Sequence, residues 1–161
     1  MVQKILIAYY SRSGNTKKIA DLIRQQVGGT LHEITPEIPY PNSYQETVDQ
    51  AKIEIRDGHK PALQSALDHP DSYDVVFIGS PNWWDTIAPP VATFLSVYDF
   101  SGKTIVPFCT HGGGGLGRIR KDIAKLCPQS TLLDSFESYG SGKGDLPAQI
   151  SAWLSKLGLI D

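Results

Sequence analysis

Short polar side chains gather near the N-terminus, where they can donate hydrogen bonds to an anion. The segment consists of Ser11, Arg12, Ser13, Gly14, Asn15 and Thr16. Its glycine lets the backbone approach a ligand closely, and a helix beginning here would point unpaired amides and a favourable dipole at the turn. An ordinary helix N-cap would explain one hydroxyl. Four short donors and a glycine are more than capping needs, so the segment predicts a phosphate site.

Two apolar patterns flank this turn. Residues 5–9 are almost all apolar, which predicts a strand covered on both faces. Ile19, Ile23 and Val27 then recur at helical spacing. No acidic residue occurs in the first twenty positions, whereas four are basic. The turn should therefore join a strand to the N-terminus of a helix in a region that attracts anions.

Adjacent tryptophans, Trp83 and Trp84, stand in a predicted loop that covers residues 80–90. A loop offers little core to fill, and tryptophan is common where a flat partner must be stacked. Alternatively, one ring anchors the loop on the following helix; we expect one ring in each role. Pro81 and the prolines at 89 and 90 should stiffen the loop, which suits a preformed site.

A third unusual loop, Thr110 and His111 followed by glycines 112–115, comes after the predicted strand 103–109. Such a glycine run costs backbone entropy, and close approach of a ligand would explain it, although a flexible turn would too. His111 could titrate near a ligand or simply hydrogen-bond its own loop. Glycines 112, 114 and 117 fit a dinucleotide fingerprint, but too little chain follows Asp134 for a second nucleotide-binding half.

Cys109 begins the same loop, but the arginine that a cysteine-dependent phosphatase needs six positions later is replaced by Gly115. A buried thiol is the simpler interpretation. A phosphate turn, flat aromatics and a glycine-rich loop together suit a ligand with one phosphate and a planar ring, and flavin mononucleotide (FMN) is the obvious candidate. The absence of a Walker motif disfavours a nucleoside triphosphate.

The composition limits the alternatives. A chain of 161 residues with a net charge of −2 makes nucleic acid a poor main partner. No apolar run reaches the ~18 residues of a membrane span, and no signal-peptide pattern is present. The only cysteines, Cys109 and Cys127, form no disulfide framework. We expect a cytoplasmic protein.

Strands and helices are predicted to alternate along the whole chain. The expected strands are 3–9, 30–35, 73–79, 103–109 and 130–134, and the expected helices are 15–27, 43–56, 89–98, 115–126 and 145–157. This alternation predicts an α/β fold with a parallel sheet, helices on both faces and a ligand at the carboxyl ends of the strands. Pro107 removes one donor of the strand ladder, so an irregularity should appear there. Segment 36–61 could be a solvated excursion, or could bring Tyr40 or Tyr44 over the ligand.

In these features the chain resembles flavodoxin-like proteins, over essentially its whole length. The segment 11–16 is the specific match, and the loops at 80–84 and 110–114 are weaker ones. The resemblance implies a single three-layer flavodoxin-like domain over 1–161, with strand order 2-1-3-4-5 and FMN held non-covalently. Residues 11–16 would hold the phosphate. The ring would lie between Pro81, Asn82, Trp83, Trp84 and Asp85 on one side and Thr110, His111, Gly112 and Gly113 on the other.

Two departures from the family pattern concern redox behaviour. Relatives with a similar tryptophan pair generally have glycine next, where this chain has Asp85. A carboxylate near the flavin could accept a hydrogen bond from the reduced ring or repel its anionic form. Dedicated electron carriers of the family also tend to be strongly acidic, unlike this chain.

Three functions remain to be compared. The first is electron transfer or flavin-dependent oxidoreduction with a redox partner protein, which needs no catalytic side chain because the flavin supplies the chemistry. The second is a quinone reductase of the same fold that uses NAD(P)H. The third is a cofactor-free partner-binding domain. A phosphorylated receiver module is disfavoured, because Tyr10-Ser11 and Gly79-Ser80 stand where it needs acids.

Overall fold

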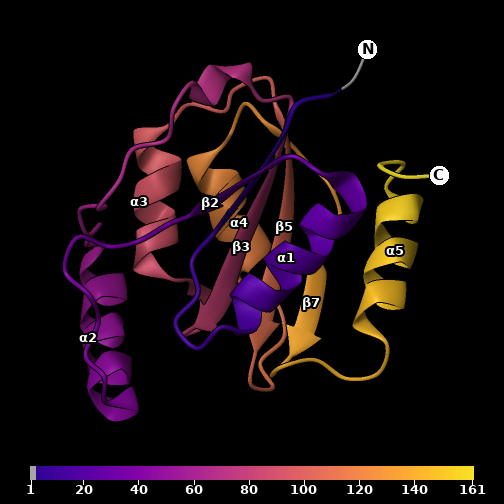
Figure 1. Cartoon of the computed structure of the whole chain (residues 1–161). Helices are drawn as coiled ribbons and strands as arrows, with labels where there is room; N and C mark the ends of the chain where they lie inside the picture. The colour runs from indigo at the N-terminus through magenta and orange to yellow at the C-terminus, as the bar shows by residue number, and fades with distance from the viewer. Residues whose placement is uncertain (1–2) are drawn as a thin grey trace.

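The computed structural model describes residues 3–161 and contains a parallel sheet between two layers of helices (Figure 1). Residues 1 and 2 of the predicted domain lie outside this range. The main strands run in the order β2-β1-β3-β5-β6, which confirms the predicted 2-1-3-4-5 arrangement. These strands are β1 (Ile5–Tyr9), β2 (Thr30–Glu33), β3 (Val75–Trp83), β5 (Thr104–His111) and β6 (Thr131–Leu132).

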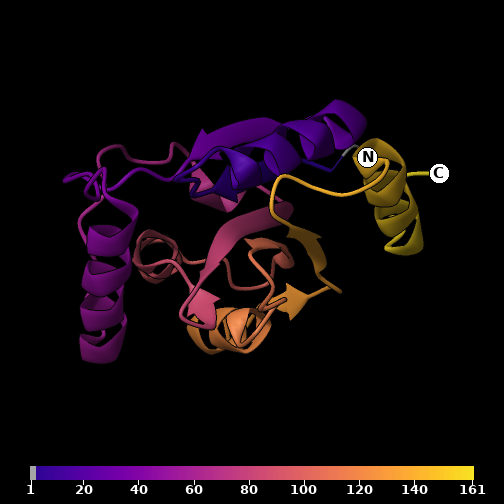
Figure 2. The same cartoon turned by 90° about the horizontal axis from the view of Figure 1, so that it is seen from below.

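Helices cover both faces of the sheet because its central strands are apolar on both sides. In β1, Leu6 and Ala8 face one core, which also contains residues of α3 (Pro89–Val97) and α4 (Ile119–Leu126). Ile7 and Tyr9 face the other core, with α1 (Asn15–Val27) and α5 (Leu146–Lys156). The remaining helix, α2 (Tyr44–Asp57), stands beside α3 at the margin of the sheet (Figure 2).

The last predicted strand, 130–134, is shortened to β6, and a further short strand follows it. β6 pairs with the beginning of β5, and β7 (Phe136–Tyr139), which the sequence did not predict, pairs with its end. Leu133 N–H donates to the Ile105 carbonyl (3.0 Å), so the next donor of β5 on this side would be residue 107. Pro107 has no N–H. The predicted irregularity therefore falls on the partner strand: β6 ends at Leu132, and strand pairing with β5 resumes only at Phe136.

The segment after β3 is a β-hairpin rather than the predicted loop. β3 continues to Trp83 and pairs antiparallel with β4 (Thr86–Ile87). Only Trp84 and Asp85 connect the two strands, and their φ angles are +53° and +71°. Two-residue hairpins favour turns with positive φ at both central positions, which asparagine and glycine adopt more easily. Trp83 therefore ends a strand and Trp84 begins the tight turn, so the hairpin fixes the two rings separately.

Helix α4 begins at Ile119, later than the predicted residue 115. Gly115 and Gly117 have φ angles of +65° and +51°, which a right-handed helix does not contain. The glycine-rich segment is therefore irregular up to the helix. Within residues 3–161, no helix is both long and apolar enough to cross a membrane.

We predict that Gly79→Ala destabilises the fold. A Cβ at this position of β3 would lie 2.2 Å from Cζ of Phe108, whose ring is fully buried. Overpacking of this kind should lower the free energy of unfolding by about 1–3 kcal/mol in urea denaturation. Phe108→Leu in the same chain should recover part of the loss.

Gly112→Ala is the matched control, since nothing lies within 4 Å of a Cβ there and its φ angle is not positive. The control should change stability by less than about 0.5 kcal/mol. Equal stability of Gly79→Ala and the unmodified protein would contradict the packing described here.

Candidate functional site

The turn between β1 and α1 leaves main-chain donors free at the start of the helix. Gly14 is the N-cap in a left-handed conformation (φ +97°), and no side chain caps from that position. Instead, Ser11 Oγ accepts hydrogen bonds from the amides of Gly14 (3.1 Å) and Lys17 (3.2 Å). In the described part of the chain, no acceptor is bound to the amides of Asn15 and Thr16. This donor set suits an anion, because α1 also directs its positive dipole end here.

A buried pair of hydroxyls joins this turn to the end of β5. Thr16 Oγ1 and Thr110 Oγ1 are 2.7 Å apart, and the two residues are 1% and 4% exposed. The Thr110 hydroxyl contacts the first turn of α1, and its expected place beside a ring stays a prediction. This contact holds the N-terminus of α1 against the start of the glycine-rich loop that follows β5.

Arg12 has a structural partner of its own. Its Nη2 donates to the carbonyl oxygens of Asn42 (3.0 Å) and Pro41 (3.3 Å), just before α2. The guanidinium therefore holds the segment that leads into α2 against the turn. Its predicted contact with a phosphate stays a prediction.

A cavity of about 420 Å³ opens beside the turn. It brings together seven predicted site residues and four residues from α2, and no carboxylate lies among them. The lining residues are Arg12, Ser13, Thr16, Pro81, Asn82, Trp83 and Trp84, with Tyr44, Thr47, Val48 and Ala51. The lining combines apolar side chains, uncharged donors and the guanidinium of Arg12, and it contains no nucleophile paired with a base, which favours ligand binding over catalysis by side chains.

The wall formed by α2 was largely missed by the sequence analysis. Tyr44 was considered as one alternative, but Thr47, Val48 and Ala51 were not. These four residues recur at helical spacing and so form one stripe along α2. That stripe is the signal that could have found them, although a helix packing on any surface gives a similar pattern.

The tryptophan rings take different roles. Trp83 packs edge-to-face against Tyr10 and Tyr40, with ring centroids 5.4 and 5.0 Å away. Trp84 is 45% exposed, and its Nε1 donates to the carbonyl of Val48 (3.0 Å). The turn is thus anchored on α2, which precedes it, rather than on the following helix. Both rings still line the cavity.

Asp85 lies outside the cavity lining and connects the turn to α4. Its main-chain amide donates to Asn82 Oδ1 (2.9 Å), and its carbonyl accepts from the Arg118 amide (2.7 Å). The carboxylate is exposed and 3.7 Å from Arg118 Nε. A positive φ explains why glycine would suit this position. Contact between Asp85 and a bound ring remains a prediction.

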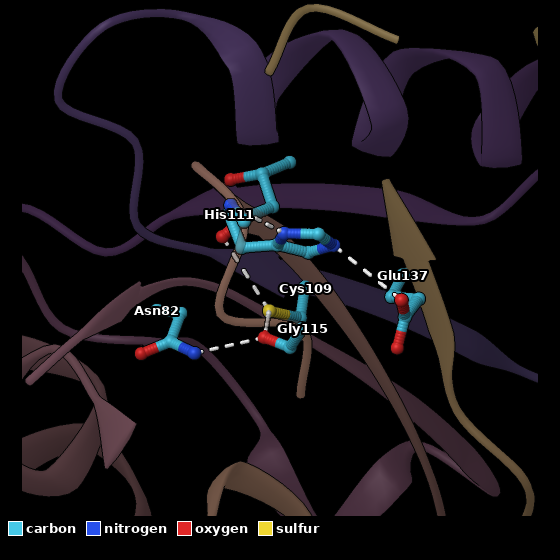
Figure 3. Close-up of polar contacts among 7 residues, drawn as sticks. Asn82, Cys109, His111, Gly115 and Glu137 are labelled. Atoms are coloured by element: carbon cyan, nitrogen blue, oxygen red, sulfur yellow. Dashed lines mark hydrogen bonds and ion pairs between the residues drawn. The ribbon is translucent and has the colours of Figure 1, made fainter. Parts of the chain in front are cut away.

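Asn82 and Cys109 tie the hairpin to the glycine-rich loop (Figure 3). Asn82 Nδ2 donates to the Gly115 carbonyl (2.8 Å), and the Cys109 thiol points at the same oxygen from 3.7 Å. Burial, with a smaller contribution from the charge of Glu137, raises the pKa of Cys109 to about 12. Cys109 is therefore a buried, protonated thiol, as expected.

His111 hydrogen-bonds its own loop. Its Nδ1 accepts from the Gly113 amide (3.0 Å), and its Nε2 lies 3.4 Å from Oε1 of Glu137 (Figure 3). This network assigns the proton to Nε2, directed at the carboxylate. His111, Gly112 and Gly113 do not line the cavity. Of the two interpretations, the geometry favours the hydrogen-bonding one.

We predict strong coupling between Thr16 and Thr110. Replacing either one with valine keeps the shape but leaves the other hydroxyl buried without its partner, so each single variant should lose about 1–3 kcal/mol of unfolding free energy. The double variant Thr16→Val/Thr110→Val should lose clearly less than the sum. Urea denaturation of all four proteins measures this cycle. Additivity within about 0.5 kcal/mol would mean that the hydroxyls do not interact.

Comparison with known proteins assigns the family and identifies close structural counterparts. A family model described as flavodoxin matches residues 4–154. A candidate flavoprotein from Bacteroides eggerthii is 32% identical, covers 97% of this chain and 98% of its own, and has a TM-score of 0.85. One from Bacteroides uniformis is 28% identical, with coverages of 96% and 99% and a TM-score of 0.84.

A third structure contains a bound cofactor. It is a flavoprotein from Lactobacillus acidophilus in complex with FMN, 28% identical, covering 84% of this chain and 93% of its own, with a TM-score of 0.69. The search of curated proteins returned no match. The family model spans nearly the whole chain and includes residues 11–16, the turn on which the resemblance to flavodoxins was based. The chain therefore belongs to the flavodoxin family.

Proposed function

We propose that this protein binds FMN non-covalently and acts in electron transfer or flavin-dependent oxidoreduction. One observation carries the proposal: the amides of Asn15 and Thr16 are unpaired at the start of α1, and Thr16 lines a cavity whose wall includes Trp83 and Trp84. A phosphate and a flat ring need this combination. The FMN complex of the Lactobacillus acidophilus relative supports it.

Different residues of this chain would hold the phosphate and the ring of the cofactor. Ser11, Ser13 and the first amides of α1 would hold the phosphate through neutral donors, while Gly14 permits close approach. Trp83, Trp84, Asn82 and Pro81 would contact the ring, together with the stripe of α2 that lines the same cavity. The bound flavin would supply one- and two-electron chemistry. The protein contributes orientation and partial exclusion of water.

A reductase that uses NAD(P)H and a quinone is the second candidate. The net charge of −2 favours it over a dedicated carrier, because so small a charge would steer a basic partner protein only weakly. A redox protein remains the partner under the first candidate. With two buried free cysteines and no disulfide, we propose the cytoplasm as the compartment.

The first test separates phosphate from ring binding. Asn15→Asp places a negative charge beside the proposed phosphate and should weaken FMN binding by about tenfold or more, which is 1.4 kcal/mol. Riboflavin lacks the phosphate, so its affinity should change little. Fluorescence titration of both ligands against both proteins measures the difference. Asn15→Ser, which keeps a neutral donor, is the control; equal losses for FMN and riboflavin would contradict the placement.

The second test separates the two candidate activities. Protein loaded with FMN is mixed with NADPH without oxygen, and the visible absorption of the flavin is followed. Direct bleaching would identify a reductase. No bleaching until a separate reductase is added would identify an electron carrier and exclude the second candidate.

A further inference from the structure

Three aromatic rings form a continuous cluster between two cavities. Trp83 lies in the wall of the proposed cofactor cavity, and Tyr40 lies 5.0 Å behind it, centroid to centroid. The rings meet at 86°, and Tyr10 completes the cluster at 5.4 Å from Trp83 and 6.1 Å from Tyr40. Tyr40 also lines a separate surface cavity of about 390 Å³. A side-chain contact therefore runs from the proposed site to another part of the surface.

Tyr40 is paired with a carboxylate that can accept its proton. The hydroxyl donates to Glu54 Oε1 (2.6 Å), while Glu54 Oε2 accepts from Gln50 Nε2 (3.1 Å). Glu54 and Gln50 also line the surface cavity, where they can exchange protons with water. Burial, followed by the hydrogen bond and the charge of Glu54, raises the pKa of Tyr40. The phenol is thus protonated at rest, with an acceptor already in place.

We propose that Tyr40 and Glu54 form a one-electron relay that restores Trp83 after oxidation. An oxidant of the photoexcited flavin or inorganic radical class removes one electron from Trp83 and leaves an indole radical cation. Tyr40 then transfers one electron to that indole, and its phenolic proton moves to Glu54 Oε1. Trp83 ends in its resting form, Tyr40 as a neutral tyrosyl radical and Glu54 as a carboxylic acid, so charge, electrons and protons balance.

The hydrogen bond to Glu54 makes Tyr40, rather than Tyr10, the electron donor to Trp83. Both rings touch Trp83, but among residues 3–161 no carboxylate accepts a hydrogen bond from Tyr10. Burial raises the pKa of Tyr10 to about 12, and the charges of Arg12 and Glu54 act on it in opposite directions. A phenol loses its proton when it is oxidised, and an adjacent carboxylate removes the need to form a phenoxyl cation. The two tyrosines therefore form a matched pair that differs in the proton acceptor.

Pulse radiolysis tests the relay without any cofactor. Azide radicals oxidise indoles by one electron and are generated in a solution of the full chain carrying Trp84→Phe, which removes the 45% exposed ring. The absorption of the indole radical should decay as the tyrosyl band rises. The rate should not depend on protein concentration, because the transfer is intramolecular. Tyr40→Phe should abolish the rise, whereas Tyr10→Phe should leave it.

Glu54→Gln tests the proton acceptor. Glutamine can keep the contacts with Tyr40 and Gln50 but is a far weaker base, so the transfer should slow by about tenfold or more, corresponding to 1.4 kcal/mol of barrier. Exchange into heavy water should slow the unmodified relay. Circular dichroism and thermal melting confirm that each variant is folded.

Several results would overturn the relay. These are persistence of the tyrosyl rise in Tyr40→Phe, an unchanged rate in Glu54→Gln, or loss of the rise in Tyr10→Phe. Because the oxidant is azide radical, none of these results depends on FMN binding. Failure of the relay and failure of the proposed function are therefore separate outcomes.

Discussion

The start of α1 imposes the constraint on which the site depends: its first amides cannot be satisfied within the helix. Ser11 accepts from Gly14 and Lys17, and the amides between them remain available. The left-handed backbone at Gly14 permits this arrangement, and the buried contact of Thr16 with Thr110 holds the helix against β5. An anion at this position would complete hydrogen bonds that the described chain leaves open.

The hairpin after β3 provides the second half of the site. Its two turn residues, Trp84 and Asp85, have positive φ, and Trp83 is the last residue of β3, so the hairpin fixes the directions of both rings. Asn82 secures this turn from both sides, accepting from Asp85 and donating to Gly115. The packing of Trp83 on Tyr40 then links the cavity wall to Glu54. The residues that shape the proposed ring site thus also connect it to a second region of the surface.

The sequence correctly predicted the features that depend on local sequence patterns. The strand, turn and helix at residues 5–27 combine an apolar run, a cluster of donors and a helical repeat, and these signals agree with the structure. Pro107 correctly indicated an irregularity. Its position could not be predicted, because the missing donor acts on a strand far along the chain.

Other features depended on tertiary contacts that no local pattern specifies. Trp-Asp is an unusual sequence for a tight hairpin, so the turn gave no recognisable signal. The stripe on α2 became part of the cavity wall only through the path of residues 36–43, which Arg12 holds in place. The sequence left two interpretations of His111 open, and its hydrogen bond with Gly113 and its proximity to Glu137 favour the structural one.

Titration calorimetry of the folded, cofactor-free protein with FMN tests the central claim most directly. The account predicts saturable binding of one FMN per chain. It also predicts a rise in unfolding free energy of about 2.7 kcal/mol when free FMN is a hundredfold above its dissociation constant. No heat of binding and no stabilisation in a protein shown to be folded would contradict the assignment of the α1 N-terminus and its neighbouring cavity to this cofactor.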